Sequence, residues 1–163
     1  MTNEPSSPVC YGAEADDVYM GYAGRDEIVA ALNELLEAER AGAKVALASS
    51  KSEAPATYRA LLRHVRDDEA KWCAMLSAQI LRLGARPSRR IGAFREKALA
   101  IGDPAERLAF LNRGQAWVVR KLEALVPRIR EDALHRDLRE MLESHRINIA
   151  RAESELASYT GMS

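Results

Sequence analysis

The chain has 163 residues, and its 24 lysine and arginine residues balance its 24 aspartate and glutamate residues. This length favours a single domain, and a hydrophobic content of 47% is enough for a core. The balanced charge argues against a protein that coats nucleic acid or a membrane surface, and no apolar run approaches the length that spans a bilayer.

Residues 1–24 show no sustained periodicity and predict an N-terminal arm in front of a helical domain at 25–160. The arm has no lysine or arginine and no long apolar stretch, so it does not have the pattern of a secretory signal. The chain has only two cysteines, Cys10 and Cys73, which is typical of a reducing compartment. We therefore expect a cytoplasmic protein.

Four later segments carry apolar residues at intervals of three and four, the pattern of amphipathic helices rather than strands. Asp26, Asp103 and Asp132 are the expected N-caps of the first, third and fourth helices, and the second is expected to start near Ser52, with Pro55 in its first turn. The predicted limits are 26–50, 54–83, 104–126 and 132–158, with a short helix around 93–100.

The connections between the four predicted helices are short, long and short. Short loops make neighbouring helices antiparallel, whereas the long connection, residues 85–102, can run the length of a helix. The second and third helices can then run parallel. The sequence therefore predicts an all-α, ferritin-like four-helix bundle with one long crossover between the second and third helices.

Each predicted helix places one strongly polar residue on its apolar stripe. These residues are Glu39, Glu69, Gln115 and His145, and each stands seven positions from apolar residues of its stripe, which is about 20° of rotation. Each also lies near the middle of its helix, so we expect the four side chains to meet in one buried polar layer. Buried carboxylates are costly unless they share a proton, pair with a cation or bind a metal.

The connectivity, together with Glu39, Glu69 and His145, resembles the ferritin-like superfamily of carboxylate-bridged di-metal proteins, rubrerythrin-like members in particular. The resemblance covers residues 26 to about 158. In that superfamily the first and third helices each supply a Glu, and the second and fourth each supply a Glu-x-x-His pair. The resemblance implies a metal site at Glu39, Glu69 and His145, with Gln115 as a weak neutral fourth ligand.

The sequence departs from that pattern at three positions. Trp72 stands in place of a His, Gln115 in place of a Glu, and Leu142 in place of another Glu. Two glutamates carry too little negative charge to neutralise two metal ions, so a dinuclear oxygen-activating centre is not expected. Two interpretations stay open. One is a non-catalytic scaffold with a vestigial polar layer; the alternative is a metalloprotein that binds one iron, manganese or zinc ion for redox or oxygen-linked chemistry.

The sequence also predicts a homodimer. This prediction rests on the apolar stretch Val18–Tyr22, together with the opposite charges of the acidic arm and of the basic segment Arg82–Lys97. No pattern indicates a nucleic-acid or membrane partner, and none identifies a small-molecule ligand, a substrate or a reaction.

Overall fold

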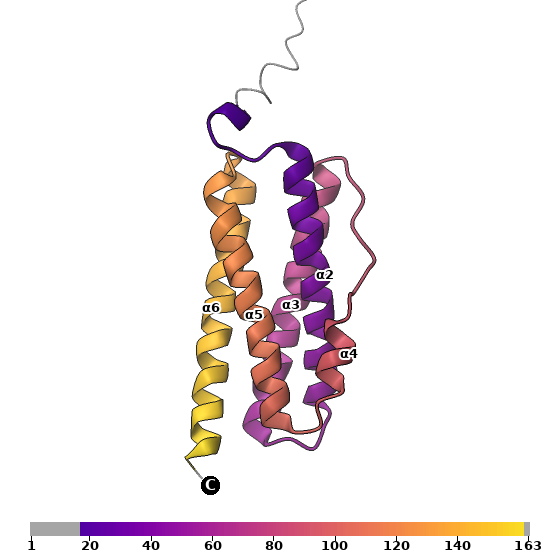
Figure 1. Cartoon of the computed structure of the whole chain (residues 1–163), viewed down its shortest axis with the longest axis vertical. Coiled ribbons are helices and arrows are strands. Elements are labelled where there is room, and N and C mark those ends of the chain that lie inside the picture. The colour runs from indigo at the N-terminus through magenta and orange to yellow at the C-terminus, as the bar shows by residue number, and fades with distance from the viewer. Residues whose placement is uncertain (1–16, 162–163) are drawn as a thin grey trace, which may run out of the picture.

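The computed structural model describes residues 17–161, and this part of the chain is all-α, without strands. The all-α prediction is confirmed. Most of the expected N-terminal arm, residues 1–16, lies outside the described residues. The long helices lie alongside one another (Figure 1), and there are four of them among the described residues. They are α2 (Arg25–Ser50), α3 (Ala56–Arg82), α5 (Pro104–Leu125) and α6 (Asp132–Thr160), with a short α4 (Phe94–Leu99) and a 3-10 turn η1 (Val126–Arg128).

The long helices run in two directions along the long axis of the molecule (Figure 1). Helices α2 and α6 point one way, and α3 and α5 point the other way. Short turns join α2 to α3 and α5 to α6, so each of these pairs is antiparallel. The connection from α3 to α5 instead returns along the outside of α2 and contains α4.

Side chains of α2 hold this connection in place. The backbone N–H of Ser88 donates to Asn33 Oδ1 at 2.7 Å, and the Ser88 hydroxyl donates to Glu37 Oε1 at 2.5 Å. One turn further along α2, Arg40 Nη1 donates to the carbonyl oxygen of Arg90 at 3.0 Å. These bonds fix the path that brings α4 against α2 and α5.

Three helix starts differ from the sequence-based predictions. Helix α2 begins after Gly24, and α3 begins after Pro55 rather than near Ser52; neither has a side-chain cap. The cap of α6 is Glu131, whose carboxylate accepts from the backbone N–H groups of Ala133 and Leu134. Asp103 does cap α5, accepting from Glu106 N at 2.8 Å as predicted.

The core divides into two apolar clusters along the molecule. One contains residues such as Leu36, Trp72, Val118 and Leu142, and the other contains Val45, Val65, Leu111 and Ala152. Each long helix contributes residues to both clusters. Along each helix, the residue of the polar layer stands between the residues of one cluster and those of the other. The polar layer therefore separates the two halves of the core. No described helix is long and apolar enough to cross a membrane.

Candidate functional site

The structure buries all four residues of the polar layer. Glu39 and His145 are each 1% exposed, and Glu69 and Gln115 are 3% and 4% exposed. They come from four different helices, α2, α3, α5 and α6, and all four line one cavity. The helical period sets this placement, because a residue seven positions from buried leucines faces the same way as they do.

His145 is held through both nitrogens of its ring. Nδ1 lies 3.0 Å from the carbonyl oxygen of Met141, and because a carbonyl can only accept, Nδ1 carries a hydrogen. Nε2 lies 3.0 Å from Glu39 Oε1, a contact that needs one further proton on either atom. Burial lowers the pKa of His145, but the negative charge of Glu39 and the hydrogen bonds to Glu39 and Met141 outweigh it and raise the pKa. The protonated form of the His145 ring is therefore more favoured than in a free imidazole.

Glu69 has no such partner. Burial is the largest cause that raises the pKa of Glu69 well above its ordinary value of 4.5, and the negative charges of Glu39 and Asp68 add to it. Burial and the neighbouring negative charges therefore favour the neutral, protonated carboxyl of Glu69.

Three oxygens of the polar layer accept no hydrogen bond from the described chain. They are Glu39 Oε2, Glu69 Oε2 and Gln115 Oε1, and all three are buried. A structural network normally satisfies its own members, because an unpaired buried polar atom costs about 1–3 kcal/mol. The polar layer is therefore only partly satisfied from within the chain.

The cavity beside the polar layer has a volume of about 510 Å³ and lies mainly between α2 and α5. Its walls are mainly apolar and include three aromatic side chains, and its rim carries charges of both signs. The aromatic wall residues are Phe94, Phe110 and Trp117, and the rim residues include Glu34, Glu37, Arg113 and Arg120. An apolar cavity of this size with a few convergent polar groups is the usual form of a small-molecule site.

Two glycines shape this cavity. A Cβ at Gly42 would lie 2.5 Å from Glu69 Oε1, so Gly42 leaves room for the Glu69 carboxyl against α2. A Cβ at Gly114 would lie 2.7 Å from Cζ of Phe94, so Gly114 lets the Phe94 ring lie against α5. The Phe94 ring also stacks on Phe110, with ring centroids 5.0 Å apart. In this way α4 closes one side of the cavity.

The metal site implied by the ferritin-like resemblance does not fit this arrangement. Trp72 and Leu142, 3% and 7% exposed, lie in the apolar core and cannot replace the missing ligands of a dinuclear centre. Within residues 17–161, no three His, Cys, Asp or Glu side chains are grouped so that they could hold one metal ion. Glu39 and His145 bond each other instead.

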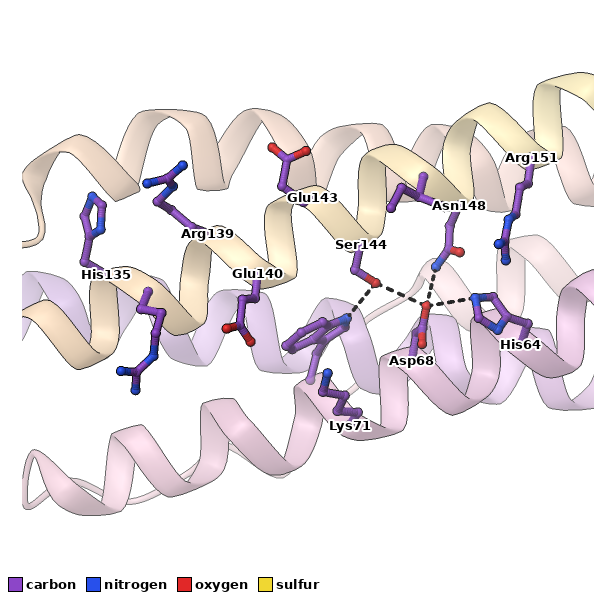
Figure 2. A pocket seen from close by; sticks show the side chains of 13 residues that line it. His64, Asp68, Lys71, His135, Arg139, Glu140, Glu143, Ser144, Asn148 and Arg151 are labelled. Atoms are coloured by element: carbon purple, nitrogen blue, oxygen red, sulfur yellow. Dashed lines mark hydrogen bonds and ion pairs between the residues drawn. The ribbon is translucent and has the colours of Figure 1, made fainter.

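A second hollow, of about 720 Å³, lies between α3 and α6 (Figure 2). At its centre Asp68 Oδ2 accepts from Ser144 Oγ at 3.1 Å and from Asn148 Nδ2 at 2.9 Å, and His64 Nε2 lies 3.3 Å from the same oxygen. Trp72 Nε1 donates to Ser144 Oγ at 3.4 Å. Ser144 and His64 thus both bind a carboxylate rather than each other, which is not the arrangement of a nucleophile with its base.

The helical periodicity does not identify Asp68 as the partner of Asn148. Asn148 of α6 makes an interhelical hydrogen bond to Asp68 of α3, in the α3–α6 hollow. The Met141 carbonyl orients His145, through the four-residue spacing of a helix turn. The spacing of four residues can be read from the sequence. Any residue type at position 141 would supply the same backbone carbonyl, however, so the sequence does not indicate this bond.

Comparison with known proteins places the chain in a family. No curated protein and no solved structure matches it. A family model matches residues 26–155, a stretch that includes the polar layer together with Gly42 and Gly114. The chain therefore belongs to the family described as a domain of unknown function, DUF6306.

Proposed function

We propose that this protein binds a small organic molecule in the cavity between α2 and α5, with the polar layer at the inner end of the site. The observation that carries this proposal is the set of three unpartnered buried oxygens on Glu39, Glu69 and Gln115. Because all three residues line the cavity, a molecule with hydrogen-bond donors can satisfy them there.

The experiment is a fragment screen on the full chain, read by the rise in melting temperature that a ligand of the folded state produces. Trp117 lines the cavity, so a change in its fluorescence gives a second, local readout. Fragments of about 8–15 non-hydrogen atoms suit a cavity of this size.

A matched pair of variants tests where the fragments bind. Ala38 lines the cavity, and Ala38→Phe fills part of it with a ring. Ala70 is exposed on α3 away from the cavity, and Ala70→Phe adds the same ring at the surface. Fragments that stabilise the wild-type chain and Ala70→Phe but not Ala38→Phe support the proposal. Equal stabilisation of all three chains contradicts it.

The fold that we propose is a ferritin-like four-helix bundle. Its support is the common direction of α3 and α5 and the long connection along α2 (Figure 1). The central position of the polar layer between two apolar clusters adds to this support. A single-metal or dinuclear function is not part of the proposal, because the donor groups are not placed for it.

A purely structural polar layer is the second candidate. The buried hydrogen bond of 3.0 Å between Glu39 and His145 favours it, because such a pair can fix the register of α2 against α6. Under this candidate the protein is a non-catalytic scaffold with a vestigial layer. A fragment screen without any cavity-dependent stabilisation would favour the scaffold.

Two further proposals concern the state of the protein in the cell. A homodimer is supported by the exposure of three consecutive side chains, Val18 at 61%, Tyr19 at 89% and Met20 at 70%. A cytoplasmic location is supported by the low cysteine content and by the free thiol of Cys73.

A further inference from the structure

We infer that the molecule bound in the α2–α5 cavity is an organic cation, with an ammonium group against the carboxyl groups of Glu39 and Glu69 and an apolar body against the aromatic walls. This inference rests on the proposed function. It adds the chemical class of the ligand, which the presence of a cavity does not determine.

The first observation is the kind of polar atom that the cavity offers. Glu39 Oε2 and Glu69 Oε2 are acceptors when the carboxyl groups are ionised, and neither has a partner in the described chain. Both side chains are more than nine-tenths buried and line the cavity. An ammonium group has three N–H donors and can serve several of these oxygens at once.

The second observation is the missing counter-charge. His145 Nε2 is engaged with Glu39 Oε1, and within the described residues no cationic group is among the causes that shift the pKa of Glu69. The charges that act on Glu69 are those of Glu39 and Asp68, both negative. Without a ligand the neutral carboxyl of Glu69 is favoured, and an ammonium group would give that carboxyl the cationic partner with which it can ionise. An anionic ligand would add a further negative charge to a buried site.

The third observation is the aromatic wall. Two of the wall rings already have cations over them near the rim: the Arg113 guanidinium lies 5.5 Å from the Phe110 ring centroid, and Lys121 Nζ lies 5.2 Å from that of Trp117. Aromatic faces attract cations through their quadrupole. The aromatic walls therefore suit the apolar body of a bound ligand.

The test compares three probes of nearly equal shape: benzylamine, which is cationic, benzyl alcohol, which is neutral, and benzoate, which is anionic. Isothermal titration calorimetry on the full chain measures each dissociation constant. We expect benzylamine to bind at least about tenfold more tightly than benzyl alcohol, since a charge-assisted hydrogen bond replaces a neutral one, and more tightly still than benzoate.

A matched pair of variants tests whether Glu69 causes the preference for benzylamine. Glu69→Gln keeps the shape of the side chain and removes its ability to ionise. Glu140 is an exposed carboxylate outside the cavity, and Glu140→Gln removes the same group there. We expect the preference for benzylamine to fall by about tenfold in Glu69→Gln and to stay unchanged in Glu140→Gln. Should Glu69→Gln fail to fold, the comparison of the three probes on the wild-type chain still decides.

The outcomes separate this inference from the proposed function. Similar affinities for all three probes, lost in Ala38→Phe, contradict the cationic ligand and leave the proposed cavity function standing. Preference for benzoate also contradicts the cationic ligand alone. The absence of binding by any probe contradicts the cationic ligand, and the fragment screen then decides on the proposed cavity function.

Discussion

Gly42 of α2 and the carboxyl group of Glu69 of α3 lie closer together than any side chain at position 42 would allow. A Cβ on Gly42 would lie 2.5 Å from Glu69 Oε1 and 2.8 Å from Oε2. The polar layer therefore depends on a glycine on the neighbouring helix, three residues after Glu39. Gly42 has no polar side chain, but the absence of a side chain there leaves room for the Glu69 carboxyl.

Gly42→Ala should displace the Glu69 carboxyl and destabilise the protein by about 1–3 kcal/mol, the usual cost of overpacking a core. Urea denaturation monitored by circular dichroism measures this loss. Gly102→Ala is the control, because a Cβ there meets nothing within 4 Å. Similar stabilities of Gly42→Ala and Gly102→Ala would show that the close approach to Glu69 is absent.

His145→Ala should destabilise the protein by about 3–5 kcal/mol, because it leaves Glu39 buried without its partner and opens a void. His64→Ala removes an imidazole–carboxylate contact from a partly exposed site, where a change within about 1 kcal/mol is expected. Chemical denaturation of both variants checks the contrast. A small effect at His145, equal to that at His64, would contradict the buried pair.

The stability of the protein should fall as the pH rises from about 5 to 8. The pKa of Glu69 is raised in the folded chain, so above 4.5 the unfolded chain releases a proton that the folded chain retains. The pKa of His145 is also raised, so its stabilisation is complete below 6.5 and is lost as the pH passes its folded value. The lowered pKa values of Glu27 and Glu131 affect stability only at acidic pH, below about 4.5.

Urea denaturation at a series of pH values measures how the free energy of unfolding declines between pH 5 and 8. Glu69→Gln should raise the stability at neutral pH and make the decline shallower, leaving the part that belongs to His145. A wild-type stability that increases between pH 5 and 8 would contradict the assigned directions of both pKa shifts.

The protein purified without a chelator should contain far less than one equivalent of iron, manganese or zinc per chain, because no three ligands of the described residues are grouped for an ion. Elemental analysis by mass spectrometry measures the content. A stoichiometric metal that disappears in Glu39→Ala and His145→Ala would contradict this expectation and restore the single-metal interpretation.

Light scattering should report a dimer, twice the chain mass of 18.1 kDa, at micromolar concentration. Tyr19→Asp places a charge in the exposed Val18–Met20 stretch and should shift the protein toward the monomer. Tyr159→Asp alters an exposed tyrosine on α6 and should leave the dimer intact. A wild-type monomer would contradict the dimer.

The helical period was enough to predict the polar layer, since burial of Glu39 or His145 follows from its spacing to neighbouring leucines. The helix starts were harder to predict, because several candidate caps stand close together. Glu131 rather than the adjacent Asp132 caps α6, a choice set by which side chain reaches the free N–H groups.

The cavity could not be predicted from the sequence. It depends on contacts between distant segments, such as Phe94 in the long connection lying over Gly114 of α5. It also depends on the rotation of α3, which brings Glu69 to the cavity and leaves Asp68 in the α3–α6 hollow. A difference of one residue on a helix is about 100° of rotation, so the packing of neighbouring helices decides such cases.

A crystal structure of the protein soaked with benzylamine locates the bound ligand directly. We expect density for the compound between α2 and α5, with its nitrogen within hydrogen-bond distance of an oxygen of Glu39 or Glu69. A structure in which the four polar side chains point to solvent, or in which benzylamine binds only elsewhere on the surface, would contradict it.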